Sequence, residues 1–134
     1  MVTHHTALIY TMVLVSAADG EMTDAELAAI GEIVRTLPVF RDCNADLLTS
    51  ASEDCANLLG EDEGLETVLG IIARSLPEGL RETAYVVACE VATADLVADQ
   101  EELRLLEMLR FHLEIDRLHA AAIERATRAR HATA

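Results

Sequence analysis

This chain repeats the stretch Ala18-Asp19-Gly20-Glu21-Met22-Thr23-Asp24-Ala25-Glu26-Leu27, 76 positions later, as Ala94-Asp95-Leu96-Val97-Ala98-Asp99-Gln100-Glu101-Glu102-Leu103. Four pairs are identical between the copies: Ala18/Ala94, Asp19/Asp95, Glu26/Glu102 and Leu27/Leu103. Each copy follows an apolar run and precedes an amphipathic one. The repeat therefore predicts a unit of helix, acidic turn and helix that occurs twice, related by an internal pseudo-two-fold axis.

Length and composition favour one all-α domain spanning residues 1–134. A chain of 134 residues can bury a substantial core. Hydrophobic residues make up 51% of the chain and aromatic residues 3%, so the core must consist mainly of aliphatic side chains, which suits packed helices. Periodicity predicts a compact bundle of about seven helices with short connections, at roughly residues 3–18, 24–36, 45–59, 62–75, 77–94, 100–113 and 117–130.

The helical spacing also predicts which residues face inward and which end the helices. In the two amphipathic helices of the repeat, the expected buried faces are Leu27, Ile30, Ile33, Val34 and Leu37, and Leu103, Leu106, Leu109 and Leu113. The expected N-terminal caps are Thr23, Asn44 and Asp116. Gly20 suits the left-handed conformation that follows many helices.

The formal net charge of −14 limits the classes of partner. Such a surface repels phosphate backbones and anionic lipid, which argues against nucleic-acid binding and electrostatic membrane docking. The apolar run at residues 8–15 is too short to span a bilayer and is interpreted as a core helix, so we expect no membrane insertion. Three cysteines without C-x-x-C spacing indicate reduced thiols, and hence a cytoplasmic protein.

The acidic residues of the repeat have two different explanations. Thr23 and Glu26 form a capping-box pattern, and Asp99 and Glu102 repeat it with Asp as the cap. Asp19 and Asp95 instead follow apolar helices, where the helix dipole disfavours a carboxylate unless something compensates its charge.

These carboxylates motivate a metal-site hypothesis. If the two helical units pair symmetrically, one pocket could contain all four carboxylates, and a divalent cation with oxygen ligands would relieve their mutual repulsion. The ion is not specified by the sequence, and capping or solvation remains the alternative. The expected ligands are Asp19, Glu26, Asp95 and Glu102. An EF-hand is excluded, because its sixth position would be Asp24 and its twelfth Ile30.

Other chemistry is not indicated by the sequence. The histidines lack the H-x-x-x-H spacing of zinc sites, and there is no phosphate-binding glycine loop or nucleophile elbow. We therefore expect a protein that is not an enzyme.

The acidic turns resemble the motif of the TerB-like tellurite-resistance family, which is related to a domain of the co-chaperone DjlA. The resemblance covers residues 17–26 in the first repeat, and residues 82–95 with 101–103 in the second. It extends over most of the chain and implies an all-helical, internally repeated fold. One position departs from the repeat, because Leu96 stands where the first copy has Gly20.

The resemblance implies a role in tellurite resistance and related stress responses, in metal-associated protein complexes at the inner face of the membrane. The motif acids that it carries over are Asp19, Glu26, Asp95 and Glu102. The alternative is a protein–protein interaction module, in the form of a homodimer for example, in which the acids act only as helix caps. The candidate contact surface lies on the helix predicted at residues 45–59, and the other possibility is that its side chains are buried in the core of the monomer. It consists of Leu47, Leu48, Leu58 and Leu59.

Overall fold

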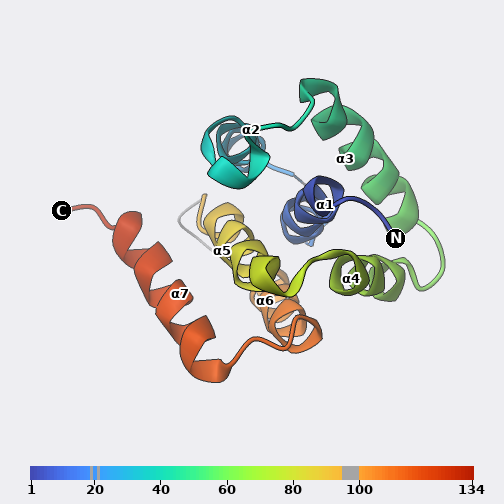
Figure 1. Ribbon diagram of the computed structural model, residues 1–134. Helices are drawn as coiled ribbons and strands as arrows, with labels where there is room; N and C mark the ends of the chain where they lie inside the picture. The colour runs from blue at the N-terminus through green and yellow to red at the C-terminus, as the bar shows by residue number, and fades with distance from the viewer. Residues whose placement is uncertain (19, 21, 95–99) are drawn as a thin grey trace.

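The computed structural model describes residues 1–18, 20, 22–94 and 100–134. In this part of the chain, seven α-helices and two 3₁₀ turns make up all the regular structure, as Figure 1 shows. The elements are α1 (His4–Ser16), α2 (Asp24–Thr36), η1 (Pro38–Phe40), α3 (Ala45–Leu59), α4 (Gly64–Ser75), η2 (Glu78–Leu80), α5 (Arg81–Ala92), α6 (Gln100–His112) and α7 (Arg117–Arg130). The predicted all-α bundle is confirmed.

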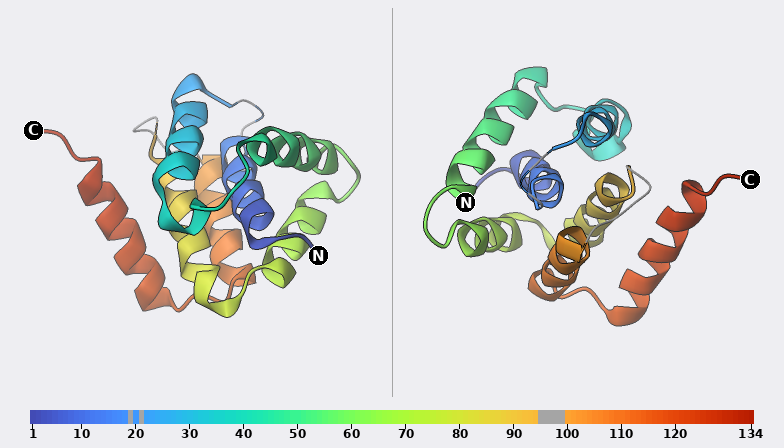
Figure 2. Two further views of the ribbon diagram at one scale, coloured as in Figure 1. Left: turned by 45° about the horizontal axis from the view of Figure 1, so that its top comes forward. Right: turned by 180° about the vertical axis from the view of Figure 1, so that it is seen from behind.

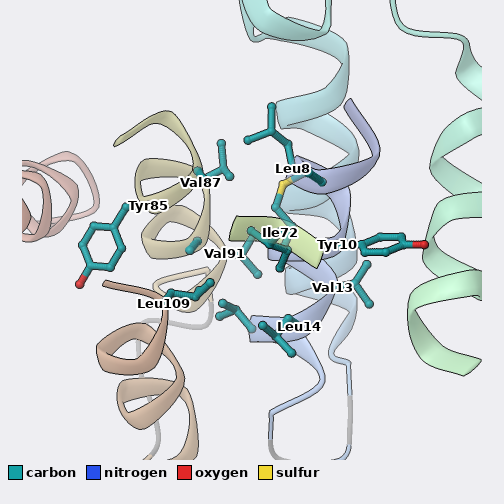
Figure 3. Close-up of a cluster of buried hydrophobic side chains, with 14 of the residues drawn as sticks. Leu8, Tyr10, Val13, Leu14, Ile72, Tyr85, Val87, Val91 and Leu109 are labelled. Carbon is teal, nitrogen blue, oxygen red and sulfur yellow. The ribbon is translucent and has the colours of Figure 1, made fainter. Parts of the chain in front are cut away.

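Two apolar helices, α1 and α5, form the centre of the molecule and pack against each other. Every residue of α1 from Ala7 to Ser16 is buried, so this helix has no solvent-facing side. Leu8 and Leu14 of α1 and Val87 and Val91 of α5 belong to the cluster drawn in Figure 3. A helix that is apolar all round can be stable only when other helices enclose it, which accounts for its central place.

The packing of the remaining helices follows a pseudo-two-fold arrangement. From the first half, α2 packs against α5, and from the second half α6 packs against α1. Likewise α3 covers α1, and α7 covers α5. The bounds of α2 and α6 differ by the same 76 positions as the sequence repeat. The first half has one further helix, α4, which packs against α1 and α3.

Side chains cap the helices largely where the sequence predicts. Asn44 accepts a hydrogen bond from the backbone N–H of Asp46, and Asp116 accepts one from that of Leu118. Gly20 has a φ of 89°, the left-handed conformation expected there. These caps satisfy backbone groups that would otherwise lack partners in the first or last turn.

Two predicted helix starts are wrong. Helix α4 begins at Gly64 and not at 62, because Glu63 adopts a left-handed φ of 57°. Helix α5 begins at Arg81, because the 3₁₀ turn η2 separates it from Pro77. The cluster Glu61-Asp62-Glu63 therefore precedes α4 and does not form its first turn.

The predicted burial of two leucines is also wrong. Leu27 is 50% exposed and Leu103 is 51% exposed, at equivalent positions of the repeat. Both lie in the first turn and a half of their helices, at the margin of the apolar face. Ile30, Leu109 and Leu113 are buried as predicted.

Two of the three cysteines are buried and have raised pKa values. Cys43, Cys55 and Cys89 are free thiols, and burial raises the pKa of Cys55 and of Cys89 to about 12. Both thiols are therefore unreactive near neutral pH.

In the described residues, no helix is both long enough and apolar enough to cross a bilayer.

The tight turn between α3 and α4 depends on Gly64. A Cβ atom there would collide with the carbonyl oxygen of Leu58 and lie 2.9 Å from backbone atoms of Leu59. We predict that Gly64→Ala lowers the free energy of unfolding by at least about 2 kcal/mol, since backbone atoms cannot move aside as side chains do. Urea denaturation followed by circular dichroism measures this change.

Gly31 provides the matched control. It lies within α2, and a Cβ atom there would meet no atom within 4 Å. Gly31→Ala should raise the free energy of unfolding by roughly 0.5–1 kcal/mol through helix propensity alone. Equal effects of the two substitutions would contradict the importance of the close approach at Gly64.

Candidate functional site

The two acidic turns of the repeat connect helices that meet at one end of the molecule. In the left view of Figure 2, α1 and α5 run toward the same end, and α2 and α6 run back from it. The N-terminal turns of α2 and α6 therefore lie at this end, which we call the turn end. Residues separated by 76 positions are in this way brought to one side of the fold.

Glu26 is a nearly buried carboxylate in the first turn of α2. Its side chain is part of a complete capping box: the backbone N–H of Thr23 donates to Glu26 Oε1 at 3.0 Å, and the N–H of Glu26 donates to Thr23 Oγ1 at 3.1 Å. Only 2% of Glu26 is exposed. The capping prediction is confirmed for this residue, and it supplies the hydrogen bonds that a buried carboxylate requires.

Glu102 occupies the equivalent place in α6. It is 4% exposed, close to the value for Glu26, and lies in the first turn of its helix. Its expected capping partner, Asp99, lies outside the described residues. The repeat therefore places two buried carboxylates at the turn end, one from each half of the chain.

The other two predicted ligands, Asp19 and Asp95, also lie outside the described residues. Over the part that the structure describes, there is no group of three or more His, Cys, Asp or Glu side chains that could hold a metal ion. The four-carboxylate site stays a prediction, of which Glu26 and Glu102 are the described half. Carboxylates of this kind offer hard oxygen ligands, the type that divalent Ca²⁺, Mg²⁺ and Mn²⁺ prefer.

A second feature, which the sequence reasoning missed, is a pocket between α5, α6 and α7. Its volume is about 290 Å³, and its wall includes Leu103 and Leu106 of α6 and Thr127 of α7. Within it the hydroxyl of Tyr85 donates a hydrogen bond to the carboxylate of Glu124. Figure 3 shows the Tyr85 ring directed away from α1. Burial, together with this hydrogen bond, raises the pKa of Tyr85, so the hydroxyl keeps its proton.

The signal for this pocket was present in the sequence but weak. Tyr85 is one of only two tyrosines in the chain, and it lies within an apolar run that needs no hydroxyl. Glu124 is the one acidic residue within the otherwise basic α7. Only the packing of α7 on α5 shows that these two belong together.

A polar cluster fastens the C-terminal end of α7 to α5. Glu90 accepts hydrogen bonds from Arg130 Nε at 2.8 Å and Arg130 Nη2 at 3.3 Å, and its other contact is with His131 Nε2 at 2.8 Å. Burial opposes ionisation of Glu90, but the hydrogen bonds and charges of Arg130 and His131 outweigh it, so the pKa of Glu90 lies below its usual 4.5.

Comparison with known families settles the classification. The family model described as "Tellurite resistance protein TerB" matches residues 5–125, which is most of the chain. The chain belongs to the TerB family. No curated protein and no solved structure matched it in the same comparisons.

The TerB match includes both acidic turns, α1 from its second residue, all of α2 to α6, and α7 as far as residue 125. The resemblance noted from the acidic motifs is confirmed, and the protein is a tellurite-resistance-type domain. Arg130, which contacts Glu90, lies beyond the matched range.

We predict that Glu90→Gln lowers the free energy of unfolding by about 1 kcal/mol at pH 7, because Arg130 is largely exposed and solvent screens the pair. The folded-state pKa of Glu90 is lowered, so its contribution is complete above about pH 4.5 and is lost as the pH falls through that lowered pKa. Urea denaturation from pH 7 to 3 measures the difference, which should vanish at the acidic end.

Glu82→Gln on the same helix is the matched control. Glu82 contacts His119 at 3.4 Å, and both side chains are more than half exposed. Its loss should change the free energy of unfolding by less than about 0.5 kcal/mol. If the free energies of unfolding of Glu90→Gln and wild type differed by the same amount at every pH, the ionic origin of the effect would be contradicted.

Proposed function

We propose that this TerB-family protein is a non-enzymatic domain that binds a divalent metal ion at the turn end, through the repeated acidic turns. The observation that carries the proposal is the placement of Glu26 and Glu102: two nearly buried carboxylates, from equivalent positions of the repeat, at one end of the molecule. Asp19 and Asp95 precede them by seven residues each. Together the four residues would supply the oxygen ligands.

The chemistry of the turn end supports a hard cation. Carboxylates gathered from both halves of a chain with a net charge of −14 repel one another. A divalent ion removes this repulsion and adds oxygen coordination. Glu26 has one carboxylate oxygen in the capping box, so a monodentate contact through its Oε2 would leave the cap intact.

Such a domain would work by binding and not by catalysis. A metal ion bound at the turn end would link the two halves of the fold, since α1 and α2 reach this end from the first half and α5 and α6 from the second. The role that we propose is metal-dependent assembly with protein partners in a tellurite-resistance complex, in the cytoplasm. The acidic surface would favour basic partner segments over nucleic acid.

Calorimetry tests the metal proposal directly. We predict that wild-type protein, stripped with chelator, gives saturable heat with at least one of Ca²⁺, Mg²⁺, Mn²⁺ and Zn²⁺. At a free concentration of 100 times Kd, the same ion should stabilise the fold by about 2.7 kcal/mol. Asp19→Asn/Asp95→Asn should abolish both effects.

The control is Asp42→Asn/Asp46→Asn, which makes the same change in charge. Both residues are exposed and follow the C-terminal end of α2, about one helix length of 20 Å from its first turn. This variant should bind metal like wild type. Absence of metal-dependent heat or melting shift in wild type would refute the proposed function.

A homodimeric interaction module is the second candidate. The α3 leucines that the sequence suggested for such a contact are partly buried against the core, so little of their surface is available to a partner: Leu47, Leu48, Leu58 and Leu59. The observation in its favour lies elsewhere: Phe111 is 78% exposed and Leu118 is 75% exposed, on either side of the turn between α6 and α7. Contiguous exposed apolar patches often mark contact surfaces, and a dimer interface here would be built around these two side chains.

If this second function holds, sedimentation velocity will show a dimer that Phe111→Ser/Leu118→Ser converts to monomer without loss of helicity. Both side chains are mostly solvated, so the fold should lose less than about 0.5 kcal/mol. Leu47→Ser on α3 serves as a comparison that affects the packed core. A monomer at all concentrations would remove this candidate.

A further inference from the structure

Helix α7 contributes little to the apolar core. Within this helix, only Ala120 and Ile123 belong to the core or pack against it. Helix α3, which covers α1 as α7 covers α5, contributes six side chains: Leu47, Leu48, Ala51, Cys55, Leu58 and Leu59. Burial of apolar surface is the main favourable term when a helix packs, so α7 is attached less firmly than its counterpart.

Open spaces separate α7 from its neighbours on both flanks. The pocket around Tyr85, of about 290 Å³, lies between α7 and α6. A groove of about 270 Å³ follows the other flank, between α7 and α5, and its lining includes Val86, Ala122 and Ala126. Side chains that border such spaces lack the dispersion contacts of a close-packed interior. Among the described residues α7 packs chiefly on α5, as Figure 1 shows, whereas α3 packs on both α1 and α4.

Polar contacts therefore supply much of the attachment of α7. Near the middle of the helix, Glu124 accepts a hydrogen bond from Tyr85. At its C-terminal end, Arg130 and His131 each contact Glu90 at 2.8 Å. The Arg130 side chain is 70% exposed, so water screens this contact and can replace it when the helix moves away. Contacts of this kind contribute little net free energy, so they allow α7 to separate from α5.

The N-terminal end of α7 is fastened through the turn that joins it to α6. Nη1 of Arg81 donates hydrogen bonds to the carbonyl oxygen of Leu113 at 3.4 Å and to the carboxylate of Glu114 at 3.1 Å. Arg81 is the first residue of α5, so the turn before α7 is tied to the same helix that α7 covers. This turn can serve as a pivot about which α7 moves as a unit.

We propose that α7 is a displaceable cover on α5. It swings away from α5 about the turn at residues 113–116 while α1 to α6 stay folded, and it exposes the face of α5 that contains the buried Tyr85 and Cys89. Segments that open in this way without global unfolding are those with few buried apolar contacts, which is the property of α7. The movement goes beyond the proposed metal binding and does not depend on it, so it is measured with chelator present.

Two buried thiols report this movement separately from unfolding. Cys89 of α5 is 3% exposed and borders the same pocket as Glu124 and Thr127 of α7. Cys55 of α3 is fully buried and lies against α1, where its thiol is 3.8 Å from the carbonyl oxygen of Tyr10. Burial raises the pKa of both thiols to about 12, so each reacts only after it is exposed. Detachment of α7 exposes Cys89 and leaves Cys55 covered.

The experiment is labelling with N-ethylmaleimide under native conditions. In Cys43→Ser the two remaining thiols lie in different tryptic peptides, so mass spectrometry follows each one. Cys89 should react at least about tenfold faster than Cys55, because α7 opens at a lower free energy than the core. Urea below the unfolding transition should accelerate Cys55 more than Cys89, since the larger opening exposes more surface. Equal rates for the two thiols would overturn the proposal, because α7 would then leave only when the whole chain unfolds.

Glu90→Gln and Asn44→Ala form a matched pair, because each weakens one polar contact, in the second and the first half respectively. Glu90→Gln weakens the contact with Arg130 and should raise the labelling rate of Cys89 about fivefold. Asn44→Ala removes the cap of α3 and should raise the rate of Cys55 about fivefold while leaving that of Cys89 within about twofold, because α3 stays folded when α7 detaches. The proposal is wrong if Asn44→Ala accelerates both thiols equally. It is also wrong if Glu90→Gln leaves Cys89 unchanged.

Hydrogen exchange of the backbone amides decides whether α7 moves as a unit. An isolated helix of 14 residues is marginal in water, so its amides lose protection when it detaches. The amides from Ala121 to Arg130 should exchange through one opening with a common free energy, lower than that of the α1 amides. Exchange that becomes faster only toward Arg130 would show fraying of the helix end and would contradict the proposed movement.

Discussion

The contact between α1 and α5 is the constraint on which the rest of the fold depends. Helix α1 is buried on every side from Ala7 to Ser16, so it has to be enclosed before the chain can be stable. Each of the two central helices receives an amphipathic helix from the opposite half, α6 on α1 and α2 on α5. This exchange joins the two repeats into one core and brings the N-terminal turns of α2 and α6 to the same end.

The outer helix of the second half is held differently from its counterpart. Helix α3 is packed between α1 and α4, whereas among the described residues α7 packs chiefly on α5. Hydrogen bonds from Tyr85 to Glu124 and from Arg130 to Glu90 supplement its apolar contacts. Grooves consequently remain on both sides of α7, so the second half of the fold offers surfaces that the first half has used for internal packing.

Local patterns in the sequence predicted helices and caps well, because these depend on neighbouring residues. The bounds of α3 and α7 agree with the prediction, and so does the capping box of Thr23 and Glu26. The predicted burial of Leu27 and Leu103 failed because spacing identifies an apolar face without showing how far the packed helices extend over it. The left-handed Glu63 was missed because a non-glycine residue there is held by the α3–α4 turn, not by its own preference.

By itself, the sequence determined the all-α class, the internal repeat and the TerB motif, since periodicity and repeated residues are properties of the chain alone. It also identified Glu26 and Glu102 as caps or ligands. Only the tertiary structure decided that both are buried at one end of the molecule. It likewise decided that Tyr85 meets Glu124 and that a groove lies between α5 and α7, because each of these depends on how helices distant in sequence pack together.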